Sequence, residues 1–86
     1  MSHILIADDE KSMRDFLKIL LHKEGHQVTT ASNAEEAFAE VTSGSFDLVI
    51  TDIRMPGKSG LELLEEIKEF NIDIPVIMIT AFASPD

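Results

Sequence analysis

The sequence predicts an α/β fold built on a doubly wound parallel sheet. Short apolar runs alternate along the chain with segments whose apolar residues recur at helical spacing. The connections between these segments are short, which favours right-handed crossovers and parallel strands. The run at residues 48–51 has an unbroken Leu-Val-Ile core, and residues 76–79 are entirely apolar. The unbroken core of residues 48–51 is typical of a strand that is covered on both faces.

The first half of the chain predicts a strand, a helix and a second strand. Residues 3–8 form the first strand, and residues 11–24 form a helix that ends at Gly25, a residue favoured just past helix ends. The apolar positions of this helix are Met13, Phe16, Leu17, Leu20 and Leu21. Residues 27–31 are strand-like but more polar, so we expect them at an edge of the sheet.

A second helix and a third strand follow. Asn33 and Glu36 form an N-cap pair that is close to a capping box. The helix after them presents an apolar face and ends near Gly44; the face consists of Ala34, Ala37, Phe38 and Val41. Residues 46–51 are predicted as the third strand.

The last predicted elements are a third helix and a fourth strand. Ser59 and Glu62 have the capping-box spacing that starts a helix. We expect its buried stripe to contain Leu61, Leu64 and Ile67, with Leu63 and Phe70 beside it. Residues 75–80 form the fourth strand.

Composition narrows the class of protein. The 86 residues make one small domain, and 44% hydrophobic with 27% charged residues is ordinary for a globular chain. The net charge of −9 opposes direct binding to nucleic acid, which needs clustered Lys and Arg. There is no cysteine for a disulfide or a thiolate metal site. We read neither a signal peptide nor a run of the roughly 20 apolar residues that span a membrane, and therefore expect a cytoplasmic protein.

Three aspartates follow two of the predicted strands. Asp8 and Asp9 end the first apolar run, and Asp52 ends the third strand. In the flavodoxin-like strand order 2-1-3-4, these two strands flank the point where the order reverses, which is where open parallel sheets bind ligands. Crowded carboxylates repel each other, so the cluster predicts a hard divalent cation, which we expect to be Mg2+. Helix capping and turn formation explain one of these aspartates better than all three.

The cluster also predicts a chemistry. Asp52 has the position of a carboxylate nucleophile that attacks a phosphoryl group, with Mg2+ on Asp9 and Asp52 offsetting the charge. Thr80 ends the neighbouring fourth strand, where its hydroxyl can hydrogen-bond the new group, although a lone strand-end threonine more often satisfies local backbone. Lys58 is interpreted as an exposed loop lysine. The three histidines have no metal-site spacing, and we assign them no chemistry.

Three stretches of the chain, residues 4–10, 47–57 and 75–81, together resemble the receiver domain of two-component response regulators. The resemblance covers essentially the whole chain. It implies that Asp52 is the phospho-accepting aspartate. Asp8 and Asp9 match the acidic pair that organises Mg2+, with Asp9 the direct ligand, and the backbone carbonyl of Arg54 matches the third protein ligand.

The same resemblance implies a switch and a partner. Thr80 matches the switch hydroxyl, and Ala81 matches the small residue that leaves room for the phosphoryl group. A histidine kinase would donate the phosphoryl group, which the receiver transfers to itself and slowly hydrolyses. The amino-acid sequences of these motifs are most similar to those of receivers of ATPase-type transcriptional activators.

The chain departs from the family pattern after Thr80. A complete receiver has about 120 residues, a size typical of single domains, and adds a helix, a strand with a site lysine, and a last helix. We therefore expect residues 1–86 to form a single, truncated receiver domain with impaired phosphorylation. Its fourth strand would have a free edge beside an uncovered sheet face, so we expect a homo-oligomer.

Two other functions stay open at this point. A Mg2+-dependent phosphohydrolase also uses an aspartyl-phosphate, but it typically has an acid two residues beyond the nucleophile, where this chain has Arg54. The second alternative is a non-catalytic fragment whose main property is self-association. The sequence does not distinguish this alternative from a signalling module.

Overall fold

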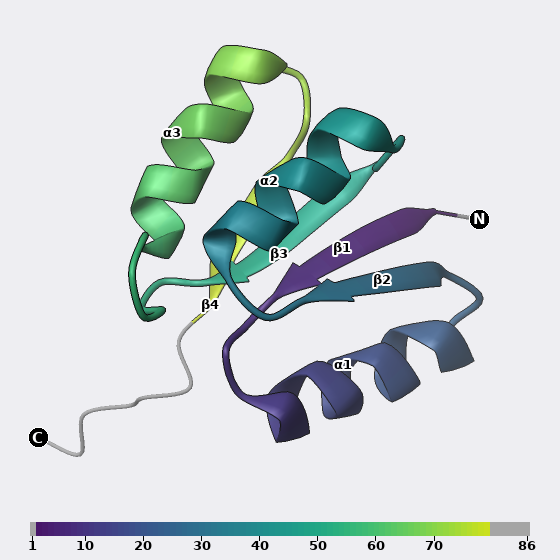
Figure 1. Ribbon diagram of the computed structural model, residues 1–86. Helices are drawn as coiled ribbons and strands as arrows, with labels where there is room; N and C mark the ends of the chain where they lie inside the picture. Colours follow the sequence, from purple (N-terminus) through teal and green to yellow (C-terminus); the bar gives the residue numbers. More distant parts are fainter. Residues whose placement is uncertain (1, 80–86) are drawn as a thin grey trace, which may run out of the picture.

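The computed structural model describes residues 2–79 as a single parallel sheet with helices on both faces. The strand order is β2-β1-β3-β4, as predicted, and all three strand pairs are parallel. Figure 1 shows α1 on one face and α2 with α3 on the other. The elements are β1 (His3–Ala7), α1 (Lys11–Lys23), β2 (Gln27–Ala31), α2 (Ala34–Ser43), β3 (Leu48–Asp52), α3 (Gly60–Phe70) and β4 (Val76–Ile79).

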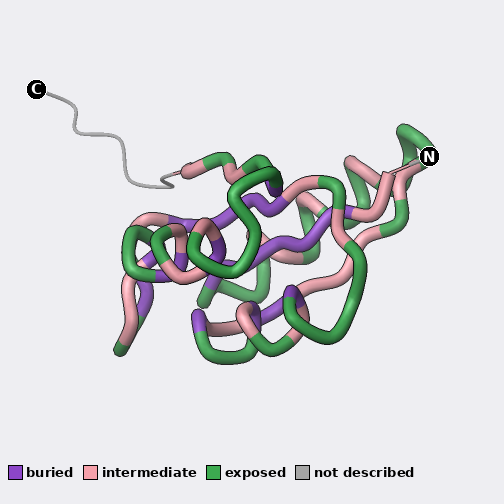
Figure 2. Tube along the Cα trace, turned by 90° about the horizontal axis from the view of Figure 1, so that it is seen from above, coloured by how far each residue is buried: buried purple, intermediate pink, exposed green. Residues whose placement is uncertain are grey.

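The two central strands carry the core on both of their faces. Leu5 and Val49 belong to the cluster under α2 and α3, while Ile4, Ile6 and Ile50 belong to the cluster under α1. Because successive strand residues point to opposite faces, one short strand supplies both clusters. Figure 2 shows the buried residues concentrated along β1 and β3, with the outer turns of the helices exposed.

The end of α1 follows the predicted glycine signal. Gly25 has φ of +92°, in the left-handed region that glycine adopts without strain. Its amide donates to the carbonyl of His22, and the amide of His26 donates to the carbonyl of Leu21. These two bonds form a Schellman motif, which satisfies carbonyls at the helix end and turns the chain into β2.

The N-termini of α2 and α3 are capped by side chains. Ser59 and Glu62 form the full capping box that their spacing predicts. Asn33 accepts a bond from the amide of Glu36 at 2.7 Å, but the Glu36 carboxylate accepts from the amide of Ser32, also at 2.7 Å. The pair at α2 is therefore a capping box shifted by one residue.

The predicted buried stripe of α3 is wrong in two of its three positions. Leu61 is 55% exposed and Leu64 is half-buried, whereas Leu63 and Ile67 are fully buried. The reason is that Gly60 begins the helix directly against the sheet, which turns positions 60, 63 and 67 inward. The boundary of β3 also differs, because the strand begins at Leu48 and continues through Asp52.

Helix α1 covers only part of its face of the sheet. It packs against β1 and β2, and within the described residues none of its own residues is fully buried. Leu17 and Leu21 contact the core, but Phe16 is 61% exposed and Leu20 is 45% exposed. The helical spacing predicted the element correctly and overstated its burial. None of the described helices has the length and apolarity needed to cross a bilayer.

Candidate functional site

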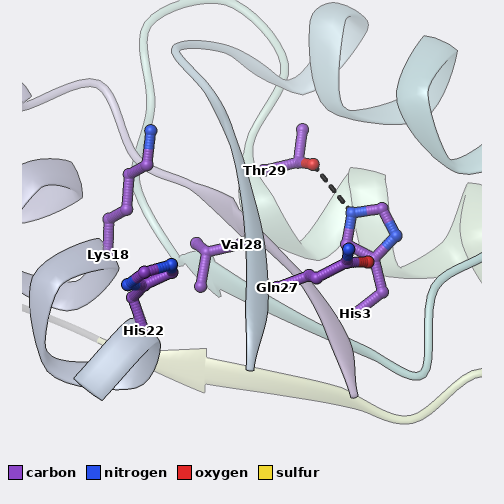
Figure 3. Close-up of a pocket in the computed structure, with 6 residues that line it drawn as sticks. All are labelled: His3, Lys18, His22, Gln27, Val28 and Thr29. Atoms are coloured by element: carbon purple, nitrogen blue, oxygen red, sulfur yellow. Dashed lines mark hydrogen bonds between the residues drawn. The ribbon is translucent and has the colours of Figure 1, made fainter. Parts of the chain in front are cut away.

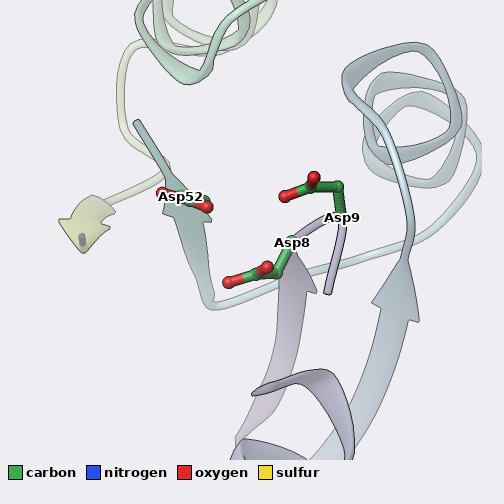
Figure 4. Close-up of side chains that lie close together, drawn as sticks. All are labelled: Asp8, Asp9 and Asp52. Atoms are coloured by element: carbon green, nitrogen blue, oxygen red, sulfur yellow. The ribbon is translucent and has the colours of Figure 1, made fainter. Parts of the chain in front are cut away.

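The three acidic side chains lie together beyond the carboxyl ends of β1 and β3. The two strands are hydrogen-bonded neighbours, with Ala7 opposite Thr51, so Asp8 and Asp52 leave the sheet at the same edge. Ligand oxygens of Asp8, Asp9 and Asp52 all lie within 4.8 Å of one another. Figure 4 shows the carboxylates of Asp8 and Asp9 on the side facing Asp52. The convergence that topology predicts is therefore observed.

Asp8 is the most buried of the three, with 1% of its surface exposed. One carboxylate oxygen, Oδ1, accepts a bond from the amide of Glu10 at 2.9 Å. The other, Oδ2, is buried and has no hydrogen-bond partner among the described residues. Burial raises the pKa of Asp8, the Glu10 amide lowers it, and the charges of Asp52 and Asp9 raise it further.

Asp52 lies at the end of β3 and is 8% exposed. Its Oδ1 accepts from the amide of Arg54 at 3.4 Å, which is long for a hydrogen bond. The Thr51 hydroxyl donates to the Asp52 carbonyl at 3.0 Å. Because the bond to its Oδ1 is long, the carboxylate of Asp52 keeps acceptor capacity for another ligand. Asp9 is the exposed member of the cluster.

The first residue of α3 packs directly on this site. A Cβ atom added at Gly60 would lie 2.0 Å from the carbonyl oxygen of Asp52. The Gly60 amide also donates to the Ile53 carbonyl at 2.9 Å. The helix can start this close only because its first residue has no side chain. Sequence reasoning missed this role of Gly60, although a glycine directly after the Ser59 cap was the available signal.

The donor set fits a hard divalent cation. Carboxylate oxygens are the ligands that Mg2+ prefers, and here three of them converge from two strand ends. The unpartnered Oδ2 of Asp8 is the specific observation, because a buried carboxylate oxygen without a donor is costly unless something binds it. Asp8, Asp9 and Asp52 are therefore the residues that would hold the ion.

The remaining predicted site residues divide into those that the structure describes and those that it does not. Arg54 is exposed and contacts Asp52 through its amide. Thr80 and Ala81 lie outside the described residues, and the described part of β4 ends at Ile79, opposite Asp52. Lys58 forms an ion pair with Glu66, which raises the pKa of the lysine, so its charge is engaged along α3.

A shallow groove of about 430 Å³ lies around the edge strand β2, away from the aspartates. Figure 3 shows Lys18, His22 and Val28 on one side of β2 and His3, Gln27 and Thr29 on the other. His3 has structural partners, since Nε2 bonds the Thr29 hydroxyl at 2.8 Å and Nδ1 bonds the Ser45 carbonyl at 3.0 Å. These side chains do not converge on a common point, so the groove is not a second site.

Comparison with known proteins decides the family. Residues 4–86 match the model of the response regulator receiver domain. The chain belongs to this family. As a receiver domain, it has the expected fold and the acidic cluster at the expected strand ends.

Solved receiver structures are closely similar. TrrA of Thermotoga maritima, in complex with Mg2+-BeF, is 47% identical with a TM-score of 0.92, over 96% of this chain and 72% of that chain. TrrA in complex with the histidine kinase ThkA is 46% identical with a TM-score of 0.91, covering 99% of this receiver and 73% of that chain.

Sequence relatives of this receiver domain include transcriptional regulators. The transcriptional regulatory protein ZraR of Klebsiella oxytoca is 45% identical over 96% of this chain and 19% of its own length. The DNA-binding transcriptional regulator NtrC of Azospirillum brasilense is 40% identical over 91% of this chain and 16% of its own length. This agrees with the predicted resemblance to receivers of transcriptional activators. The chain spans about a fifth of these relatives.

Proposed function

We propose that residues 1–86 form a single receiver domain that accepts a phosphoryl group on Asp52. The observation that carries the proposal is the position of Asp52, which ends β3 within 4.8 Å of the carboxylates of Asp8 and Asp9. The Mg2+-BeF complex of TrrA supports it by similarity. A bound Mg2+ would neutralise the acidic cluster, so that an anionic phosphoryl group can approach a carboxylate.

The transfer step needs little from the protein besides positioning. A carboxylate oxygen of Asp52 forms a bond to phosphorus as the phosphorus–nitrogen bond of a phosphohistidine donor breaks, and the leaving imidazole keeps the electron pair and takes up a proton. Burial of Asp52 at the end of β3 and the amide of Arg54 near its Oδ1 would position the attacking carboxylate. Asp9 and the carbonyl of Arg54 are proposed as ligands with Asp52, and Asp8 as the supporting acid.

The output is proposed to pass through Thr80. Its hydroxyl would hydrogen-bond the phosphoryl group, and Ala81 would leave the space for it. The proposed donor is a histidine kinase, supported by the ThkA complex of TrrA. The proposed setting is the cytoplasm, with no direct contact to nucleic acid or membrane, which the net charge of −9 supports. The guanidinium of Arg54, where a phosphohydrolase typically has an acid, argues against that alternative.

Beryllofluoride with Mg2+ tests the proposal, because it imitates a phosphoryl group on a carboxylate. We expect amide shifts at Asp52, Arg54 and Thr80 that require both components, and their loss in Asp52→Asn. Mg2+ alone should shift Asp9 in wild type. No response to the pair at millimolar concentration, or an equal response in Asp52→Asn, would overturn the assignment of the phosphoacceptor.

A second candidate property is self-association, and a specific surface favours it. Ile77 is 49% exposed on β4, which is hydrogen-bonded only to β3 within residues 2–79. Ile77 is paired with Ile50, whose side chain belongs to the cluster under α1, and Phe16 and Leu20 of α1 are also exposed. We propose that a second copy of the chain covers this face, because apolar surface beside a free strand edge pairs readily with another chain. Sedimentation tests it: a monomer throughout the micromolar range would exclude it.

A further inference from the structure

One charged residue outside the acidic cluster holds the cluster's backbone. Arg14 lies on the second turn of α1 and is half-buried. Its Nη1 donates to the backbone carbonyl of Asp8 at 2.7 Å, across six residues of chain. A guanidinium bond to a carbonyl is charge-assisted and stronger than a neutral one. The ion pairs of residues 2–79 are Lys11–Asp15 and Lys58–Glu66, so the charge of Arg14 is directed at this carbonyl and not at a carboxylate.

The turn between β1 and α1 lacks the support that the other helices have. Glu10 is the N-cap of α1 and makes no side-chain capping bond in the described part of the chain. The helices α2 and α3, in contrast, begin with Asn33 and Ser59 as capping side chains. Something else must therefore fix the turn that presents Asp8 and Asp9.

Three hydrogen bonds replace the missing cap, and all three end on Asp8. Its amide donates to the Ala31 carbonyl at 3.1 Å, which ties it to β2. Its carboxylate accepts from the Glu10 amide at 2.9 Å, which closes the turn. Its carbonyl accepts from Arg14. The first two bonds are local or belong to the sheet. Arg14 supplies the side-chain bond between the turn and α1, in addition to the helical bond from its own amide to the Glu10 carbonyl at 3.1 Å.

We propose that Arg14 is a positioning residue of the acidic site, which holds the turn so that the carboxylates of Asp8 and Asp9 converge with Asp52. This inference rests on the proposed function. Arg14 is not a ligand and does not touch the reacting atoms. It acts through the Asp8 carbonyl, in the way that groups behind metal ligands fix their orientation.

Two measurements on Arg14→Ala test the inference. Mg2+ affinity, followed by the amide shift of Asp9, should fall about tenfold, the lower end of the usual cost of removing such a support. In metal-free buffer with chelator, the Glu10 amide should exchange faster with solvent, because its bond to Asp8 opens more often. Arg14→Lys keeps a charged donor and should restore part of both effects.

Lys11→Ala is the matched control. It removes the same charge near the same helix start, and Lys11 bonds Asp15 at the surface without touching Asp8. We expect it to leave the exchange of the Glu10 amide unchanged and to shift Mg2+ affinity little, in the direction of tighter binding. If Arg14→Ala behaves like Lys11→Ala, Arg14 acts only as a charge, and the inference fails.

The two measurements, Mg2+ affinity and exchange of the Glu10 amide, distinguish a failure of the inference from a failure of the proposed function. If the wild-type chain binds no Mg2+, the proposed function fails and the exchange of the Glu10 amide decides the positioning role alone. If Mg2+ binds and Arg14→Ala, shown to be folded by its circular dichroism, changes neither affinity nor exchange, the proposed function stands and the positioning role is excluded.

Discussion

Asp8 is almost completely buried, and its carboxylate accepts few hydrogen bonds. Its pKa is raised from 3.8, and burial is the largest cause. One of its oxygens accepts a single amide bond, and the other has no partner within residues 2–79. Such a residue lowers the stability of the metal-free protein, and a bound cation would remove the penalty. The proposed Mg2+ site would therefore lower the stability of the protein whenever no ion is bound.

Asp8→Asn should separate these two effects. Without Mg2+ we expect the variant to be more stable than wild type by roughly 1 kcal/mol, because a buried charge is removed while Asn can still accept from the Glu10 amide. With Mg2+ the order should reverse, since the wild type gains binding energy that the variant lacks. Thermal unfolding with and without the ion measures both. A variant less stable than wild type in chelator would contradict this account of Asp8.

The raised pKa of Asp8 also sets a pH dependence. A folded-state pKa above the unfolded value means that the folded protein binds the proton more tightly, so this group adds stability as the pH falls through the raised pKa toward about 3.9. Mg2+ affinity should fall over the same window, because a protonated Asp8 no longer adds its negative charge to the acidic cluster. The difference between wild type and Asp8→Asn isolates this group from the other carboxylates.

At the scale of the elements, the start of α3 couples the helix to the site. Gly60 lies against the Asp52 carbonyl, and the Ser59–Glu62 capping box fixes where the helix begins. The same contact turns Leu63 and Ile67 toward the core. Core packing and the placement of Asp52 therefore depend on one position without a side chain.

Gly60→Ala should disturb both the core packing of α3 and the placement of Asp52. A methyl group 2.0 Å from a backbone oxygen forces α3 away from β3, at a cost of about 2 kcal/mol or more. We expect a lower unfolding temperature and altered amide shifts at Asp52 and Ile53. Gly25→Ala is the control, because its cost comes from φ of +92° with open space around the new Cβ. It should lower stability and leave the amide of Asp52 in place. Unchanged stability in Gly60→Ala would show that this contact is absent in solution.

At the scale of the whole molecule, the two faces of the sheet are covered unequally. Two helices pack together over one face, while α1 packs against β1 and β2 on the other. Within residues 2–79, Ile77 of β4 and Phe16 and Leu20 of α1 are exposed. The net charge of −9 opposes association of two copies, and salt screens that repulsion. Added salt should therefore strengthen any dimer that forms through this face.

Ile77→Lys tests whether two copies of the chain associate through the exposed surface of β4. It places a charge on the exposed apolar strand, and we expect the dimer dissociation constant to rise at least tenfold, because a lysine cannot be buried there unpaired. Ile72→Lys is the control, since Ile72 is 72% exposed and lies outside β4. Sedimentation of both variants at two salt concentrations gives the result. An equal effect of the two substitutions would indicate unspecific association.

Local patterns predicted those features whose physics is local. The Ser59–Glu62 spacing predicted a capping box, and Gly25 predicted the end of α1, because caps depend on residues within one turn. The alternation of elements predicted a parallel sheet, and the flavodoxin-like strand order 2-1-3-4 then placed the three aspartates together. The stripe of α3 did not follow, since Leu61 and Leu63 are both apolar and their spacing is compatible with either choice.

The sequence by itself determined the elements, the strand order and the residues of the acidic cluster, because hydrophobic period, caps and strand-end carboxylates are written in short segments. Only the tertiary structure decided which side of α3 is buried, how Gly60 lies on Asp52, and that Arg14 bonds the Asp8 carbonyl. These are contacts between parts of the chain whose relative orientation depends on packing. Hydrophobic spacing predicts that a helix has a buried face, but packing against the neighbouring strand determines which face is buried.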